Sequence, residues 1–143
     1  IAGSRHPEHE KLQRLIDKLG LKNRVRFTGH ISSNIVSSIY CEAAVFVFPS
    51  LHENFGMPIL EAMACECPVI TSNTAACPET AGDAAILLED PTSAHELADG
   101  IECVITDHET RERLIKKGRR RSQTFSWERC ARKFVALFDR LGK

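Results

Sequence analysis

The spacing of apolar residues changes repeatedly between that of strands and that of helices as far as Asp90. The chain opens on Ile-Ala-Gly, which is typical of the end of a strand, and a helical pattern then runs from Pro7 to Gly20. Residues 24–28 alternate apolar and polar side chains, which predicts a second strand. A second helix is expected after Ser32, because serine is a common N-cap.

Further strands are predicted in the middle of the chain. The run Ala44–Phe48 is apolar throughout, as a parallel strand covered on both faces requires, so we expect it to be the central strand. Shorter strands are predicted at 68–71 and 84–88, with a helix from Pro58 to about Cys65. Strands that alternate with helices predict a Rossmann-like, doubly wound parallel sheet of the α/β class.

After Asp90 the pattern is helical to the end. The last helix is expected to be capped by Ser126 and to carry an apolar stripe from Trp127 to Leu141. We expect this stripe to pack in the core, with a partner-binding face as the alternative. A length of 143 residues predicts a single domain, residues 1–143, and the start on a strand end without Met is typical of a fragment.

Composition narrows the class of protein. The 19 basic and 19 acidic residues balance, so no net field draws the chain toward nucleic acid. No stretch approaches the ~20 apolar residues of a membrane-spanning helix. The basic segment 111–121 could touch anionic lipid, but a solvated helix face that complements the helix dipole is favoured, so peripheral membrane contact is the less favoured interpretation.

The cysteines and histidines do not form a recognisable metal pattern. The six cysteines lie within apolar patterns rather than in a small disulfide framework, which predicts reduced thiols and a cytoplasmic protein. Cys65 and Cys67 are too closely spaced for a usual zinc pair. His6 and His9 are expected to be surface residues at a helix start, so no metal site is predicted.

The loop after Phe48 is where a ligand is expected, because open parallel sheets bind ligands beyond the carboxyl ends of their strands. Gly56 lets the backbone approach a ligand, and Pro58 starts a helix whose free amides favour a phosphate. Two carboxylates, Glu53 and Glu61, frame this anion site, and a carboxylate accepts hydrogen bonds from a vicinal diol. A nucleotide sugar has diphosphate and hydroxyls in this pattern. The alternative is that Glu61 complements its helix dipole and Glu53 is a solvated loop residue.

Residues 46–69, FVFPSLHENFGMPILEAMACECPV, closely resemble the E-x7-E region of the family 4 retaining glycosyltransferases of GT-B fold. Flanking segments at 24–29, 78–85, 90–91 and 125–127 agree with the same family, so the resemblance covers nearly the whole chain. It implies the C-terminal half of a GT-B two-domain fold, the half that binds the nucleotide-sugar donor.

The resemblance also implies residue roles. Glu53 would face the donor sugar and its reacting end as the catalytic residue, and Glu61 would hold the ribose hydroxyls. Backbone around Arg26 and Phe27 would border the base. Further contacts with the donor are implied for Asn54, Phe55, Gly56, Met57, Ile59 and Leu60. The implied reaction transfers a sugar from a nucleoside diphosphate with retention at the anomeric carbon and needs no metal or other cofactor.

The sequence departs from the family in two respects. Glu66 stands where the family usually has Gly, in a turn that favours a left-handed residue, and we expect this to affect stability rather than binding. The family's basic pair for the diphosphate and its N-terminal acceptor domain would both precede Ile1. The resemblance therefore implies a donor-binding domain that is inactive alone.

Two other classes of function stay open. The first is a non-catalytic module that binds a nucleotide or sugar nucleotide on the same scaffold, because fold alone does not determine function. The second is a regulatory domain that binds only a protein, which would have no need for two glutamates around Gly56.

Overall fold

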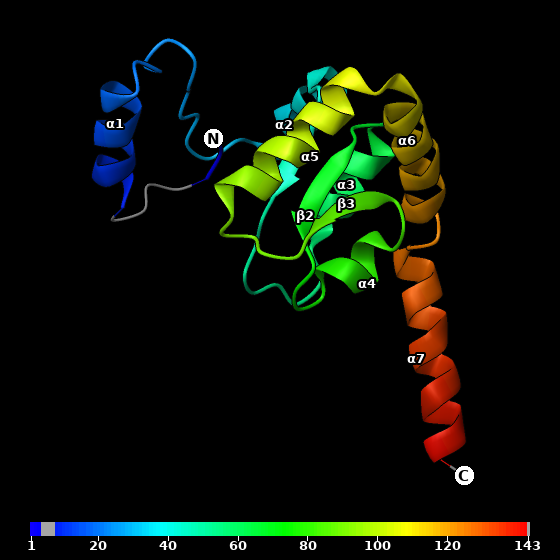
Figure 1. Ribbon diagram of the computed structural model, residues 1–143. Coiled ribbons are helices and arrows are strands. Elements are labelled where there is room, and N and C mark those ends of the chain that lie inside the picture. The colour runs from blue at the N-terminus through cyan, green and yellow to red at the C-terminus, as the bar shows by residue number, and fades with distance from the viewer. Residues whose placement is uncertain (4–7, 143) are drawn as a thin grey trace. The chain divides into compact units, whose positions relative to one another are not determined.

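The computed structural model describes residues 1–3 and 8–142. The chain divides into two compact units, Ile1–Val36 and Ser37–Lys143, and each is described by itself. Figure 1 shows their helices and strands. The predicted helix start at Pro7, and His6 beside it, lie outside the described residues. The prediction of a single domain stays a prediction.

The first unit contains one helix and a short parallel backbone pairing. Helix α1 (His9–Lys18) buries Ile16, and Gly20 follows it with a positive φ of 68°. The predicted strand at 24–28 is wrong as a strand: in the part of this unit that the structure describes, the one bridge joins Ala2 to Gly29. Backbone hydrogen bonds join Gly3 to Gly29 and Thr28 to Ile1, and an isolated pair of strands is marginally stable.

The second unit contains a parallel sheet of three strands in the order β1-β2-β3: β1 (Phe46–Phe48), β2 (Val69–Ser72) and β3 (Ala85–Leu88). Phe46 lies opposite Val69, which in turn lies opposite Ala85. The predicted parallel α/β sheet is therefore confirmed.

The position of the predicted central strand is a correction. In the described sheet, the apolar run that ends at Phe48 forms the edge strand β1, whose residues are only half-buried. The central strand is β2, which is buried at all its positions. An apolar run indicates that the faces of a strand are covered, but it carries no information on how many strands pair with it.

Helices cover both faces of this sheet (Figure 1). Helix α2 (Ser33–Glu42) precedes β1. The crossover helices are α3 (Met57–Ala64), between β1 and β2, and α4 (Cys77–Ala81), between β2 and β3. Both crossover helices contact β2, and they also contact each other. Helix α5 (Ala94–Thr106) covers the other face, where a Cβ on Gly100 would lie 3.4 Å from the Cδ1 of Ile70. Helix α6 (His108–Ser122) packs against α3 and α5. The core cluster consists of Ile70, Leu88, Val104 and Leu114.

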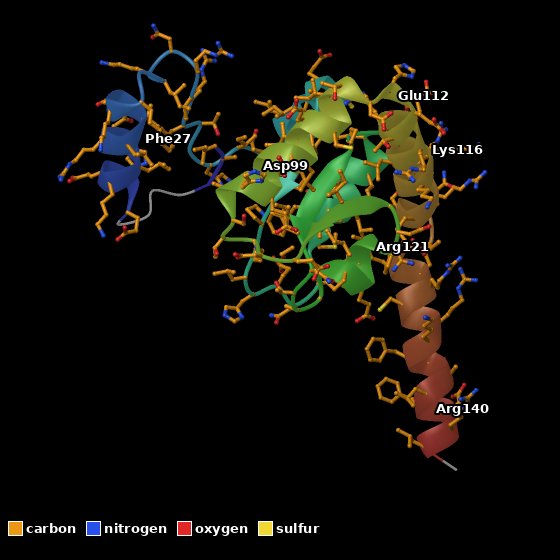
Figure 2. The ribbon with its side chains drawn as sticks, viewed as in Figure 1. Phe27, Asp99, Glu112, Lys116, Arg121 and Arg140 are labelled. Atoms are coloured by element: carbon orange, nitrogen blue, oxygen red, sulfur yellow. The ribbon has the colours of Figure 1, made fainter. Side chains whose placement is uncertain are left out.

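Helix α7 (Trp127–Leu141) has no buried residue. It begins as predicted, because the Ser126 hydroxyl accepts a hydrogen bond from the Arg129 amide at 3.1 Å. Its apolar stripe does not pack in the core, which corrects the prediction: Trp127 is 79% exposed and Phe138 65%. In Figure 2, α7 extends to Arg140 with no other element beside it. The stripe is an unpartnered apolar face of this chain.

The turn after α3 is left-handed at a residue that is not glycine. Glu66 has a φ of 60°, as its place in a turn that favours Gly predicts. Its carboxylate accepts a hydrogen bond from Arg119 on α6 at 2.9 Å, but both side chains are more than half exposed. An exposed ion pair contributes little, so it offsets only part of the backbone strain.

We predict that Glu66→Gly stabilises the chain by about 0.5–1 kcal/mol, because relief of the left-handed strain exceeds the lost surface pair. Urea unfolding followed by circular dichroism measures the change. Arg119→Ala is the control, since it removes the pair and keeps the strain, and we expect it to cost less than about 0.5 kcal/mol. A destabilised Glu66→Gly would contradict the prediction.

Candidate functional site

The loop from Pro49 to Gly56, which follows β1, is held by hydroxyl groups from the next crossover. Thr71 donates to the Phe48 carbonyl at 2.8 Å, and Thr80 donates to the Phe55 carbonyl. The Ser50 carbonyl accepts hydrogen bonds from Ser72 and Thr74. The apolar and polar pattern of the sequence did not indicate these groups, although a strand that ends in Thr-Ser offers hydroxyls where an apolar strand would not. They fix the loop at both of its ends.

Gly56 joins this loop to helix α3 and is the N-cap of that helix. Its φ of 83° is left-handed, and a Cβ there would lie 2.9 Å from the Cδ1 of Ile59 and 3.5 Å from the Cγ of Glu53. The helix begins at Met57, one residue before the predicted Pro58. A side chain at position 56 would meet Ile59, so only glycine fits there without strain.

The buried residues of the first turn of α3 can offer a ligand only their backbone groups. Ile59 is fully buried and Leu60 is 7% exposed, so their side chains are part of the core. The Ile59 amide already donates to the Gly56 carbonyl at 3.0 Å. Met57 is exposed at the helix start. The remaining amide groups at this end attract an anion through the helix dipole.

Glu53 is half-buried within the loop. One of its carboxylate oxygens accepts a hydrogen bond from the Asn54 amide at 3.2 Å, and its carbonyl accepts from the Ala76 amide at 3.2 Å. The neighbouring Ala75 has a φ of 50°, the second left-handed position outside glycine in the described chain. Strained backbone of this kind is often found at functional sites.

Phe55 is anchored on the side of α6. Its ring packs edge-on against Phe125 with centroids 5.5 Å apart, and the Arg121 guanidinium lies 4.9 Å above the Phe125 ring. Figure 2 marks Arg121, whose Nε donates to the Thr80 carbonyl at 3.0 Å. Arg121, in the predicted basic segment, is thus a structural contact that supports the loop.

Glu61 lies in the second turn of α3 and is exposed. The predictions left open that it merely complements the helix dipole, but that effect falls off within the first turn. Among the described residues no ion pair involves Glu61. Burial and the Glu61 charge raise the pKa of the nearby Tyr40 to about 12. Glu61 thus presents its carboxylate to solvent without a cationic partner.

The loop and α3 bring together Glu53, Asn54, Phe55, Gly56 and Met57. Arg26 and Phe27 belong to the unit Ile1–Val36, where the Arg26 carbonyl accepts from the Ile1 nitrogen at 2.7 Å. The Phe27 ring lies 4.4 Å from that of His9. Their proposed place beside the base stays a prediction.

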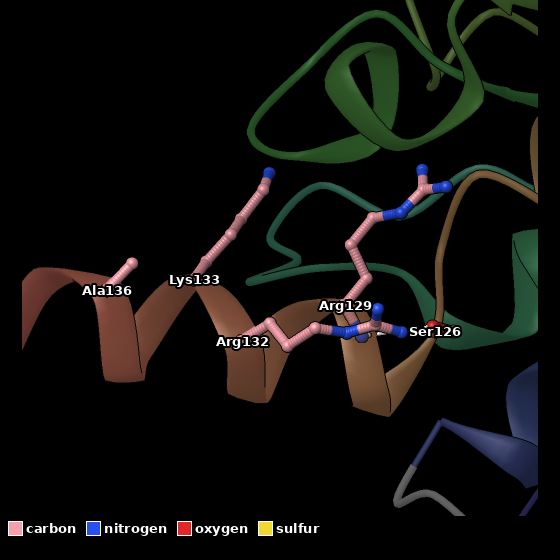
Figure 3. A pocket seen from close by; sticks show the side chains of 5 residues that line it. All are labelled: Ser126, Arg129, Arg132, Lys133 and Ala136. Carbon is pink, nitrogen blue, oxygen red and sulfur yellow. Dashed lines mark hydrogen bonds between the residues drawn. The ribbon is translucent and has the colours of Figure 1, made fainter.

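A basic hollow at the start of α7 was not singled out from the sequence. It is lined by Ser126, Arg129, Arg132, Lys133 and Ala136 (Figure 3). Two of its cations already bind carbonyls of the chain: Arg129 donates to Thr124 at 2.7 Å and Arg132 to Glu128 at 3.3 Å. Each of these guanidinium groups is thus partly engaged by the backbone of the chain.

Neither a metal cluster nor a membrane span is found in the part of the chain that the structure describes. No group of three or more His, Cys, Asp or Glu residues at 1–3 and 8–142 could hold a metal ion. No described helix is long and apolar enough to cross a membrane. The expected independence from metal stays a prediction.

The sequence profile of the glycosyl transferases group 1 family matches residues 1–121, and the chain belongs to this family. It is 33% identical over 141 residues to the O-antigen chain mannosyltransferase B of Escherichia coli, covering 99% of this chain and 37% of that protein. It is 30% identical over 131 residues to the MMP alpha-(1->4)-mannosyltransferase of Mycolicibacterium hassiacum, covering 90% of this chain and 32% of that protein.

Solved structures agree on the fold. The sucrose-phosphate synthase of Thermosynechococcus elongatus superposes with a TM-score of 0.84 at 32% identity, covering 98% of this chain and 37% of that one. The Anabaena HepE protein in complex with UDP and glucose superposes with a TM-score of 0.85 at 25% identity, covering 96% of this chain and 39% of that one. The fold is that of the C-terminal half of a GT-B glycosyltransferase. The chain spans about a third of the length of the proteins it matches.

We predict that Gly56→Ala destabilises the chain by about 1–3 kcal/mol, because it combines left-handed strain with a clash against Ile59. The clash is tested in a double-mutant cycle with Ile59→Val, which removes the Cδ1 atom that the new Cβ would meet. Gly56→Ala should cost less in the Ile59→Val background. Equal costs in both backgrounds, measured by urea unfolding, would show that the close contact is absent.

Proposed function

We propose that this chain is the donor-binding domain of a retaining glycosyltransferase of family 4 type, which transfers a sugar from a nucleoside-diphosphate sugar to an acceptor. The observation that carries the proposal is a pair of carboxylates around the N-terminus of α3. Glu53 lies in the loop before Gly56, and Glu61 lies in the helix after it. A loop held by hydroxyls at both ends keeps this arrangement rigid.

The charges of the site match the parts of such a donor. The helix N-terminus favours the diphosphate, and exposed Glu61 without a cationic partner can accept hydrogen bonds from the ribose diol. Glu53, half-buried beside Gly56, would face the sugar. The HepE complex with UDP and glucose and the mannosyltransferase relatives support a nucleotide-sugar donor.

Fixed hydrogen-bond donors would supply the catalytic stabilisation. In the transition state the bond between the anomeric carbon and the diphosphate lengthens, leaving positive charge on the sugar and negative charge on the diphosphate. Amides at the start of α3 are aimed at the developing negative charge, in the role that Mg²⁺ takes elsewhere. The acceptor hydroxyl oxygen then bonds to the same face of the anomeric carbon while its proton passes to the departing diphosphate, which is the retaining outcome.

We also propose that the domain is inactive alone. Nearly two thirds of the length of the mannosyltransferase B relative lies outside the match, and an N-terminal acceptor domain would supply the acceptor site and the remaining diphosphate contacts. The unpartnered apolar face of α7 fits a domain-domain contact better than solvent. A non-catalytic nucleotide-binding module on the same fold is the alternative, and it predicts binding without transfer.

We predict that one of UDP, GDP and ADP binds the chain with a Kd below about 1 mM, measured by titration calorimetry. Glu61→Ala should weaken that binding at least tenfold, roughly the effect of losing hydrogen bonds to a charged group. Glu102→Ala, which removes an exposed helical glutamate on α5, is the matched control and should leave the affinity unchanged.

Circular dichroism must first show that both variants are folded. Absence of binding by all three nucleotides at millimolar concentration would overturn the proposed donor site. If the Glu61→Ala variant binds as tightly as wild type, Glu61 does not hold the ribose hydroxyls. Transfer is then tested with the joined N-terminal domain, where turnover distinguishes the enzyme from the module.

A further inference from the structure

Arg121, near the C-terminal end of α6, joins this helix to α4 (Figure 2). Its Nε donates to the Thr80 carbonyl at 3.0 Å, and its Nη2 donates to the Glu79 carbonyl. A Cβ on Gly82 would lie 3.3 Å from the Arg121 Nε, so the guanidinium fills the space that the missing side chain leaves. Arg121 is therefore fixed against the C-terminal end of α4 by hydrogen bonds and by packing.

The guanidinium also packs on an aromatic pair that reaches the candidate site. It lies 4.9 Å from the centroid of the Phe125 ring, in the short segment between α6 and α7. Phe125 contacts Phe55 edge-on, with ring planes at 78°. A cation above a ring face and an edge-on pair of rings each favour one geometry. The ring of Phe55, which lies between Glu53 and Gly56, is thus held in place from α6.

The backbone of the same loop is held by α4. The buried Thr80 hydroxyl donates to the Phe55 carbonyl, while the Thr80 carbonyl accepts from Arg121. Two residues earlier in the loop, the Glu53 carbonyl accepts at 3.2 Å from the amide of Ala76, the N-cap of α4. The segment from Glu53 to Phe55 is therefore attached to both ends of α4, and Arg121 holds the end that bears Thr80.

Helix α3, which carries Glu61, is attached to α6 at a different place. A Cβ on Gly118, nearly one turn before Arg121, would lie 3.0 Å from the Cγ of Met63 on α3, so the two helices are in close contact there. Met63 is itself buried in the core. Loss of the Arg121 contacts is therefore expected to loosen the loop that carries Glu53 and to leave Glu61 in place.

We propose that Arg121 is a positioning residue for recognition of the sugar moiety of the donor. Through Phe125 and Thr80 it fixes the loop that carries Glu53, and a loop ordered in advance binds at a lower entropic cost. The proposal rests on the proposed donor site, in which Glu53 faces the sugar and Glu61 the ribose. It requires arginine, because a lysine ammonium cannot donate in a planar fork and also stack on a ring.

The test compares wild type with Arg121→Lys, which keeps the charge and loses the fork. Calorimetry is run with the nucleoside diphosphate that binds and with its hexose conjugate, which is UDP-glucose, GDP-mannose or ADP-glucose. We expect binding of the conjugate to weaken roughly fivefold, the size of an effect transmitted through one hydrogen bond, and that of the diphosphate less than about twofold. Arg120→Lys, the same substitution at the exposed neighbour, is the control and should change neither affinity.

A second variant tests the aromatic contact. Phe125→Leu removes the ring between Arg121 and Phe55 and keeps an apolar side chain. It should lower the affinity for the hexose conjugate relative to the diphosphate, as Arg121→Lys does. Because the two residues act partly through one contact, Arg121→Lys should have a smaller effect on this ratio in the Phe125→Leu background. Equal effects in both backgrounds would overturn the proposed action through the ring.

The order of the loop can be measured without a nucleotide. In ¹⁵N relaxation, rigid backbone has an order parameter of about 0.85, and flexible backbone falls below about 0.6. In Arg121→Lys the amides of Asn54 and Phe55 should become more mobile, while that of Leu60 on α3 should keep the wild-type value. Unchanged order at the two loop amides, or an equal loss at Leu60, would overturn the positioning role.

The failures are distinguishable. If wild type binds none of the nucleotides, the donor site falls, and the role of Arg121 falls with it. If Glu53→Ala leaves the ratio of conjugate to diphosphate affinity unchanged, Glu53 does not face the sugar, and the role of Arg121 falls while the nucleotide site stands. If Glu53→Ala lowers the ratio and Arg121→Lys weakens both ligands equally or neither, only the role of Arg121 is overturned.

Discussion

The attachment of the loop after β1 to the end of β2 is the interaction on which the candidate site depends. Carbonyls of Phe48, Ser50 and Phe55 would be left without partners if the loop moved, and hydroxyls of Thr71, Ser72 and Thr80 satisfy them. These three side chains are themselves buried, so an unmade hydrogen bond would cost both partners. The loop is therefore ordered before any ligand arrives, which lowers the entropic cost of binding.

Left-handed backbone occurs at both ends of α3, and the two ends differ in what they require. At Gly56 the conformation and the absence of a Cβ are both needed, because Ile59 and Glu53 occupy the space beside it. At Glu66 only the conformation is unusual, and the side chain points to Arg119 at the surface. The left-handed conformation at Gly56 is part of the candidate site and requires glycine. The left-handed conformation at Glu66 can be adopted by glycine or by glutamate.

The core of the second unit is well packed, whereas helix α7 is not. Around Ile70 and Val104 the sheet and α5 exclude solvent, whereas α7 leaves an aromatic face in water. Exposed apolar faces of this kind are typical of interaction sites. The proposed contact with an N-terminal acceptor domain would cover this one.

The amino-acid sequence by itself determined the alternation of strands and helices, the N-cap at Ser126 and the family, because these depend on residue spacing and local backbone preference. The left-handed turn at Glu66 could also be predicted, since it depends on one dihedral angle. The loop residues from Glu53 to Met57 were found through a contiguous motif.

Only the tertiary structure decided which strand is central, where the α7 stripe lies, and what surrounds Glu61. Central position depends on pairing between β2 and two distant segments, and an apolar pattern is the same for a strand with one neighbour or two. The Thr80 hydroxyl donates to the carbonyl of Phe55, which lies 25 residues earlier in the chain. Such contacts between segments distant in the sequence arise from packing, which no local pattern of residues records.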